Sequence, residues 1–429
     1  MKKRTGTTSS APAGAVCRRL ALLALWLAAP AACDTDRLLE VNAPQQIPAE
    51  ELEKPQFAGL LVNGALGDFE CALGAHIVVG AILGDEFADA HLTSAGWSLD
   101  RRDVAPSDPY GTNGCTGGNT IGSYSPISVA RWTADNMLKK LQGWTDQQVP
   151  RRDSLIALTA NLAGFSLTML GTDFCSAAID LGPEMQPPEL FALAEQRFTT
   201  AIEAATRART PTLLHAAYVG RARVRLYLGK KAEAAADARL VPDGFVWNAT
   251  ASTVNNRRNN RIFERNNQAA AFTIEPVSRQ LRTAGQEDPR TRVIARPGRR
   301  AIDGTQLWEQ TKYPALDSPF PIATYREAQL IIAEAEGGAT AVTILNGLRA
   351  RAGLPPLSAE EIANLQQTII EERRKELWLE GHRMYDIIRF NLPLVPAPGT
   401  PFVRGGFYGT TRCLPLPDVE RFNNPNIGR

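Results

Sequence analysis

Charged side chains gather in one short segment near the C-terminus, where they could act as acids and bases or as ion pairs. The segment is "IIEERRKELWLEGHRMYDIIRF", residues 369–390. On a continuous helix its Glu376 and Glu380 lie one turn apart, a spacing that could bring two carboxylates to one substrate. The same spacing fits a solvated helix face, which is the commoner arrangement for such a charge run.

An apolar stripe runs through the same segment and favours one amphipathic helix, which we predict to continue from Ala359 to Phe390. Along this helix Arg383, Asp386 and Arg389 are spaced to pair at i, i+3. The stripe consists of Ile370, Leu377, Gly381, Met384 and Ile388.

Other residue types that could do chemistry are dispersed along the chain. The four histidines, His76, His91, His215 and His382, are widely separated, and the sequence has no C-x-x-C pair, so no zinc site is predicted. Phosphate-binding loops, nucleophile elbows, H-E-x-x-H motifs and dinucleotide fingerprints are also absent from the sequence. We therefore expect no cofactor, no metal and no enzymatic activity.

The charge balance gives the chain no strong electrostatic preference. Its 47 basic and 45 acidic residues leave a formal net charge of +2. A field that would draw the protein to nucleic acid or to an anionic membrane surface is therefore not expected.

The N-terminus has the features of an export signal, which we assign to residues 1–32. Basic residues precede a short apolar run, "LALLALWLAA" at residues 20–29, which is too short to span a bilayer. Ala31-Ala32-Cys33 then resembles a lipoprotein processing site with Cys33 as the lipidated residue. Pro30 departs from that pattern, and Ala29-Pro30-Ala31 is also an ordinary A-x-A cleavage site. We expect no later stretch to be long and apolar enough to cross a membrane.

Four cysteines remain in the mature chain besides Cys33, and an even number in an exported protein suggests disulfides. They are Cys71, Cys115, Cys175 and Cys413. Three pairings are open. Cys115 lies in the Gly-rich loop "GTNGCTGGNT", which would gain order from a cross-link, and this favours Cys71 as its partner.

Helical periodicity dominates the first half of the mature chain, and short turns separate the predicted helices. Ala194, Phe198 and Ala201 fit the A-x3-F-x2-A pattern of the second helix in a tetratricopeptide repeat, and Leu228-Gly229 fits such a repeat's turn. The predicted helices lie within residues 52–87, 127–141, 155–170, 190–205, 213–227 and 232–239.

After residue 242 the sequence first becomes loop-rich and then returns to helical periodicity. Asn, Arg, Gly and Pro dominate residues 243–318, which predicts loops with short strands. Helices are expected again at residues 325–336, 341–352 and 359–390. We predict one all-α domain over residues 33–429, built of tetratricopeptide-like hairpins with extensive loops. Its parts are residues 33–242, 243–318 and 319–429.

The charged segment resembles the C-terminal hallmark of SusD/RagB proteins, E-R-R-x-E-L-x-x-E-G-x-R-x-x-D-x-x-R followed by an aromatic residue. Upstream, "YREAQLIIAEAE" and "NGLRARAG" also resemble family motifs, with Thr324 where the family has Arg. The tail "CLPLPDVERFNNPN" is similar to the family's ending. The matching hallmark residues are Glu372, Arg373, Arg374, Glu376, Leu377, Glu380, Gly381, Arg383, Asp386 and Arg389.

This resemblance implies a binding lipoprotein in which the hallmark charges are structural. It would be anchored by lipid in the outer membrane, facing the cell surface, and would capture a glycan or other oligomeric nutrient. It would deliver that ligand to a SusC-like TonB-dependent transporter. The alternatives are an exported tetratricopeptide-type adaptor that binds protein, and an exported hydrolase; the hallmark segment argues against both.

Sugar rings stack on exposed aromatic side chains, so aromatic residues in the variable loops are the candidates for ligand contact. Each of them alone could instead pack in the core or a loop. The candidates are Trp97, Tyr110, Trp308, Tyr313, Phe407 and Tyr408.

Lipidation at Cys33 can be tested directly. Metabolic labelling with palmitate should mark the protein, and the label should disappear in Cys33→Ala. Several acyl chains on one cysteine anchor stably, so the variant should also leave the membrane fraction. Label that persists in the variant contradicts the assignment.

Overall fold

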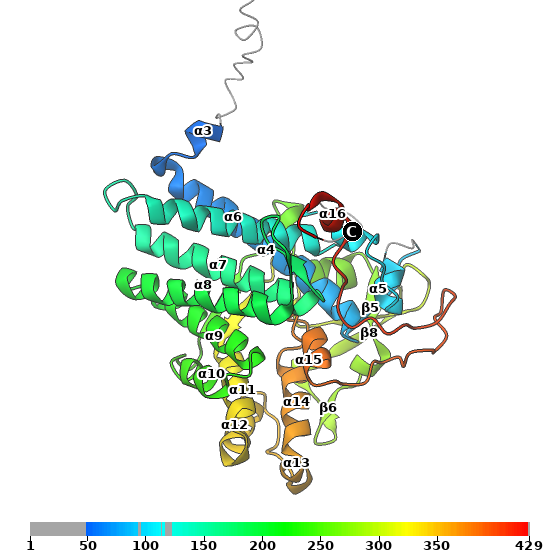
Figure 1. Ribbon diagram of the computed structural model, residues 1–429. Helices are drawn as coiled ribbons and strands as arrows, with labels where there is room; N and C mark the ends of the chain where they lie inside the picture. Colours follow the sequence, from blue (N-terminus) through cyan, green and yellow to red (C-terminus); the bar gives the residue numbers. More distant parts are fainter. Residues whose placement is uncertain (1–48, 93–95, 113, 116–121, 428–429) are drawn as a thin grey trace, which may run out of the picture. The chain divides into compact units, whose positions relative to one another are not determined.

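A computed structural model describes residues 49–92, 96–112, 114–115 and 122–427, and these are mostly helical (Figure 1). The chain separates into two units, residues 1–52 and residues 53–429. Of the first unit only the short helix α3 (Ala49–Leu52) is described. The signal segment and Cys33 lie outside the described residues, so the assignments made for them remain predictions.

The described part of the second unit has helices at every position where the sequence predicted one, and two further short ones, at residues 97–101 and 418–423, that were not predicted. The helices of this unit are α4 (Ala58–Leu83), α5 (Trp97–Arg101), α6 (Tyr124–Gly143), α7 (Arg152–Asp173), α8 (Pro187–Ala208), α9 (Pro211–Tyr227), α10 (Lys231–Ala238), α11 (Tyr325–Glu336), α12 (Gly338–Arg351), α13 (Ala359–Ala363), α14 (Leu365–Glu376), α15 (Arg383–Arg389) and α16 (Asp418–Asn423).

Most of the short strands lie in the loop-rich middle of the chain, as predicted, but four lie outside it; within the described residues the strands pair as five antiparallel two-stranded sheets. The pairs are β1 (Phe87–Asp89) with β5 (Phe272–Ile274), β2 (Ala177–Ala178) with β3 (Glu184–Met185), β4 (Val246–Ala249) with β10 (Phe320–Thr324), β6 (Arg282–Thr283) with β7 (Gln286–Glu287), and β8 (Val293–Arg300) with β9 (Gln306–Gln310).

Helices α6 to α12 pack each against the next along the chain, which gives the predicted series of helical hairpins (Figure 1). The ring of Phe198 on α8 fills the space between α7 and α9 and is fully buried. A Cβ added to Gly164 of α7 would lie 2.7 Å from this ring, and one added to Gly220 of α9 would lie closer still. Two glycines therefore make the slot that holds the large ring of the A-x3-F-x2-A pattern.

The single helix predicted for residues 359–390 is wrong, because the chain breaks it into α13, α14 and α15. Between α14 and α15, Leu379 and Gly381 have φ of 55° and 83°. Gly381 lies against the His76 imidazole, and a Cβ on it would overlap Nε2 of that ring. Helical spacing therefore no longer relates Glu376 to Glu380.

Charges of the hallmark segment are buried and paired, so a solvated face is also the wrong interpretation. Arg373 binds Asp386 at 3.2 Å, and Arg389 binds both Asp386 at 2.7 Å and Glu334 of α11 at 2.5 Å. Arg383 binds Asp85 at 2.9 Å instead of its neighbours on α15. Burial alone would raise the pKa of Asp386, but Arg373 and Arg389 hold it below its usual range.

Glutamates of the segment are bound in the same way by cations from elsewhere in the sequence. Arg290 lies 2.8 Å from Glu372 and 3.0 Å from Glu376, and Lys312 lies 2.6 Å from Glu380. Removing one partner of a buried pair leaves an uncompensated charge, which costs about 3–5 kcal/mol. These contacts tie α14 and α15 to the loop-rich middle of the chain.

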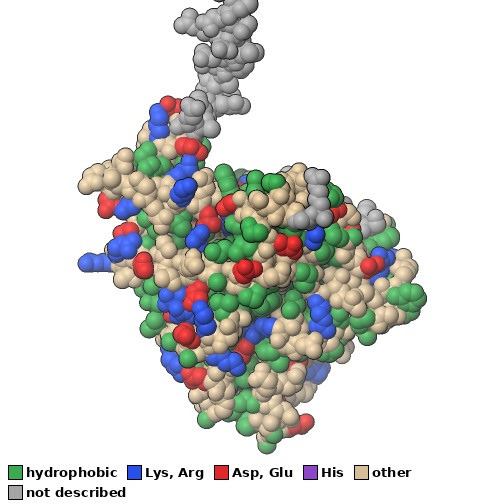
Figure 2. All heavy atoms as spheres, viewed as in Figure 1, with side chains coloured by type: hydrophobic (Ala, Val, Ile, Leu, Met, Phe, Trp, Pro, Cys, Tyr) green, Lys and Arg blue, Asp and Glu red, His purple; other side chains and the backbone are tan. Residues whose placement is uncertain are grey.

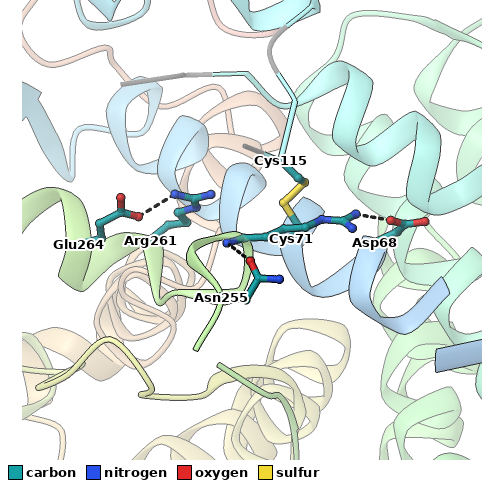
Figure 3. The surroundings of a disulfide bond; sticks show 7 residues. Asp68, Cys71, Cys115, Asn255, Arg261 and Glu264 are labelled. Atoms are coloured by element: carbon teal, nitrogen blue, oxygen red, sulfur yellow. Dashed lines mark hydrogen bonds and ion pairs between the residues drawn. A yellow bond between two sulfur atoms is a disulfide. The ribbon is translucent and has the colours of Figure 1, made fainter. Parts of the chain in front are cut away.

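Two disulfides join the mature cysteines. Cys71 of α4 pairs with Cys115, the pairing favoured from the sequence, and Cys175 pairs with Cys413. Figure 3 shows the first bond beside the ion pair between Arg261 and Glu264. The second bond attaches the C-terminal segment to the end of α7.

Two helices contradict the expectation that only the N-terminus is apolar enough to cross a membrane. Residues Pro55–Leu83 and Arg152–Asp173 meet the criteria of length and composition. Their apolar windows are 78% and 89% buried within the protein, however. Packing of α4 and α7 in the core accounts for their composition.

The glycine slot around Phe198 leads to a stability prediction. Gly220→Ala forces a methyl group against the ring and should lower the free energy of unfolding by about 1–3 kcal/mol. Gly347→Ala, in an exposed part of α12 with no atom within 4 Å of the new Cβ, should instead stabilise the protein by up to about 1 kcal/mol. Denaturant unfolding measures both variants; equal effects would show that the slot is not tight.

Candidate functional site

Two of the six predicted ligand-binding rings belong to the core. Tyr110 is 1% exposed and donates its hydroxyl hydrogen to the Pro415 carbonyl at 2.7 Å. Tyr313 is 3% exposed and donates to the Leu379 carbonyl at 3.0 Å. Their ring faces are covered by the protein itself, so the expectation that they contact ligand is corrected.

Trp97 and Tyr408 are brought together by the loop that precedes Cys413. The Arg404 guanidinium lies over the Trp97 ring at 5.6 Å and over the Phe402 ring at 5.9 Å. Phe402 in turn packs edge-on against Tyr408, with 5.3 Å between ring centres. Both predicted rings are half-buried, so each keeps some surface for a ligand.

Trp308 of β9 is joined to the same region through β5. Its backbone N–H donates to the Thr273 hydroxyl at 2.9 Å, and the Arg279 guanidinium lies 5.3 Å from its ring centre. The turn between β8 and β9 also reaches the loop that precedes Cys413, because Asp303 pairs with Arg404 of that loop at 2.7 Å. We name the residues Trp97, Arg102, Arg279, Trp308, Arg404 and Tyr408 the aromatic–arginine cluster.

Phe407 lies on the same loop and is 64% exposed. Pro401 and Phe407 form an antiparallel bridge, and the N–H of the next residue, Tyr408, donates to the Thr400 carbonyl at 2.9 Å. Neighbouring side chains of extended chain point to opposite sides. Phe407 is therefore directed away from Tyr408, and the structure does not bring it into the cluster.

Arginines were the part of the cluster that sequence reasoning missed. Arg102 is buried, lies 5.0 Å from the Tyr408 ring centre, and donates to the Val395 carbonyl at 2.8 Å. It also donates to the Pro396 carbonyl. The only signal in the sequence was closeness, because Arg102 follows Trp97 and Arg404 precedes Tyr408 by a few residues.

Two buried carboxyl groups lie beside these arginines and favour their protonated form. Burial raises the pKa of Asp100 to about 8, and nearby Glu275 raises it further. Burial also raises the pKa of Glu275 to about 7, although Arg279 and Arg102 oppose the shift. At neutral pH Asp100 therefore cancels little of the positive charge of the arginines, and Glu275 cancels only part of it.

Binding is the chemistry that this arrangement supports. Ring faces can stack on a sugar, and guanidinium N–H groups can donate to hydroxyl or acidic oxygens. Buried nitrogens of Arg102 and Arg404, namely Nε and Nη1, have no hydrogen-bond partner among the described residues. Nor does the described part of the chain bring together three side chains able to hold a metal ion.

The paired glutamates of the hallmark segment and the His76–Asp173 pair lie outside this cluster and are packed in the interior. Glu376 and Glu380 are buried and bound by cations. His76 Nδ1 lies 2.8 Å from Asp173, but its Nε2 faces the Gly381 backbone. These groups are placed to support structure.

Figure 2 shows basic and acidic side chains interspersed over the helical half, without a large area of one sign on the face in view. This distribution agrees with a formal net charge of +2. Electrostatic selectivity in this protein therefore has to be local to a site.

Comparison with known proteins gives one family match and several similar structures. Residues 282–412 match the SusD family. A SusD-like carbohydrate binding protein from Bacteroides vulgatus superposes with a TM-score of 0.61 at 17% identity, over 87% of this chain and 97% of that one. A SusD superfamily protein from Bacteroides fragilis gives 0.65 at 16%, over 88% and 99%.

A laminarin binding SusD-like protein gives a TM-score of 0.63 at 18% identity, over 87% of this chain and 98% of that one. These structural similarities, all at 18% identity or below, show the fold, and the family match is confined to residues 282–412. A comparison with curated proteins finds no match.

The raised pKa of Asp100 predicts a pH dependence of stability. The folded protein keeps this proton up to about pH 8, whereas the unfolded chain loses it near its ordinary pKa of 3.8. The free energy of unfolding should therefore fall as pH rises between those values. Asp100→Asn cannot ionise, so its melting temperature should exceed that of the wild type at pH 8.5 and differ little at pH 4.

Asp103→Asn is the matched control, because its carboxylate is 68% exposed and pairs only with Arg101 among the described residues. It should shift the melting temperature little at either pH. A gap between Asp100→Asn and the wild type that stays constant with pH would contradict the assignment.

Proposed function

From the match of residues 282–412 to the SusD family and the shared fold, we propose that this protein belongs to the SusD/RagB family and is an exported binding protein that captures a glycan or similar oligomeric nutrient. The observation that carries the proposal is the aromatic–arginine cluster, where Trp97, Trp308 and Tyr408 each have a guanidinium against the ring. Partly exposed rings beside hydrogen-bond donors are suited to sugars. The laminarin binding SusD-like protein supports the choice of a glycan.

Capture without turnover is part of the proposal. The cluster offers donors and ring faces, while its two carboxyls, Asp100 and Glu275, are buried. Glycoside hydrolysis needs two carboxyl groups that flank the scissile bond of a bound substrate. We therefore propose that the ligand leaves the protein unchanged.

Delivery to a membrane pore completes the proposed role. The protein would be held at the outer membrane through lipid on Cys33, facing the cell surface, and would pass its ligand to a SusC-like TonB-dependent transporter. Exposed apolar side chains on α6 support a protein partner, because Val129 and Trp132 are 49% and 54% exposed. Apolar side chains grouped on a surface favour protein contacts.

Glycan binding is tested by calorimetry with the purified mature chain and a panel of oligosaccharides. Trp97→Ala or Tyr408→Ala should weaken binding about tenfold or more, since each removes a ring face from the site. Phe422→Ala removes a ring that is 69% exposed on α16, outside the cluster, and should leave the affinity unchanged. Chromatography of the mixtures should show intact oligosaccharides.

Steady release of shorter products, abolished by one carboxylate substitution, would make the protein an enzyme. If Trp97→Ala and Tyr408→Ala bind the oligosaccharides with the same affinity as the wild type, the cluster is not part of the binding site. Melting curves of the variants distinguish a lost contact from a lost fold.

The transporter is tested by affinity purification from outer membranes in mild detergent. The SusC-like transporter should be recovered together with this chain in near-equal amounts. Two results together would favour an exported adaptor that binds protein instead. They are recovery of this chain alone, and nutrient uptake that is unchanged when the transporter gene is deleted.

A further inference from the structure

Within the proposed function, we infer that the ligand is an anionic saccharide, whose carboxylate or sulfate groups bind the arginines of the aromatic–arginine cluster. The inference rests on which cations in this region are already paired and which are not.

Arg279 is the clearest unpaired cation. It lies against Trp308, is half-buried, and its Nε donates to the Ile274 carbonyl at 2.7 Å. Within the described residues no carboxylate comes within ion-pair distance of it. A guanidinium fixed by a ring and one carbonyl still presents its terminal nitrogens in a fork that matches a carboxylate or sulfate.

Arg102 and Arg404 add positive charge beside it. Arg102 is bonded to carbonyls, and no ion pair joins it to any described residue. Arg404 pairs with Asp303 through Nη2, but its buried Nη1 has no hydrogen-bond partner in the described structure. Positive charge that the described residues leave unbalanced favours a negatively charged ligand at the partly exposed rings beside it.

The hairpin of β8 and β9 extends this positive region. Arg296 and Arg299 share one carboxylate, Glu309, at 2.6 and 2.7 Å. Arg300 is exposed at the end of β8 and forms no ion pair with the described residues. Since the adjoining turn contacts Arg404 through Asp303, the excess charge lies next to the cluster.

Acidic groups inside the cluster do not cancel this excess. Asp100 and Glu275 are buried, and their raised pKa values, about 8 and about 7, leave Asp100 mostly neutral and Glu275 only partly ionised at pH 7. A neutral sugar would use the ring faces and hydrogen bonds to its hydroxyls, but it would leave this positive charge unbalanced. Arginine on all three rings therefore points to a ligand with negative charge.

The test compares charged and neutral forms of the same backbone. One pair is oligogalacturonides and their methyl esters, which isolates carboxylate; the other is laminarin oligosaccharides before and after sulfation, which isolates sulfate. In at least one pair the mature wild-type chain should bind the charged member about tenfold more tightly than the neutral member at low salt. Added salt should reduce this difference in affinity.

Arg279→Gln should remove most of that difference, because it weakens binding of the charged member far more than binding of the neutral one, and Arg279→Lys should keep part of the difference. The control is Arg351→Gln on α12, another arginine stacked on a ring, 5.4 Å from the centre of Tyr325. It should bind like the wild type.

Neutral members bound as tightly as charged ones in both pairs would overturn the inference and leave the proposed function standing. An unchanged difference in affinity in Arg279→Gln would also overturn it. No binding to any of the four probes would count against both proposals.

Discussion

Burial of full charges in the segment of residues 372–389 is the constraint on which the rest of the structure depends. An ion removed from water is tolerated only when a partner of opposite charge meets it in good geometry. Here the partners come from far along the chain: Asp85 follows α4, Arg290 precedes β8, and Glu334 belongs to α11. Each pair therefore fixes a different part of the fold against α14 or α15.

The candidate site depends on the same pairs. Asp85 is bound by Arg383, and two residues later the chain enters β1, which pairs with β5 and leads to Trp97 on α5. β5 in turn binds β9 through the Thr273 hydroxyl, which positions Trp308. Rings separated by about two hundred residues of sequence are held in one region because buried charges fix the strands between them.

Local patterns predicted much of this fold, and interactions between distant residues account for what they missed. Helical periodicity is a local property, and it located α6 to α12 well. The break near Gly381 was not visible, because it depends on His76, which lies far away in sequence. For the site, residue type identified Trp97, Trp308 and Tyr408, but type alone does not show that Tyr110 and Tyr313 are covered. The arginines were missed because a guanidinium's nearest ring is set by tertiary structure.

The bond between Cys175 and Cys413 has a consequence for how this protein can change. The loop that carries Phe402, Arg404 and Tyr408 begins after α15, which the buried charges hold, and ends at a cysteine covalently joined to the helical half. Between two such fixed points, insertions and substitutions can accumulate without releasing the tail that follows. The sequence of this loop can therefore change, and with it the ligand that the protein recognises, while the helices and the disulfide on either side keep their positions.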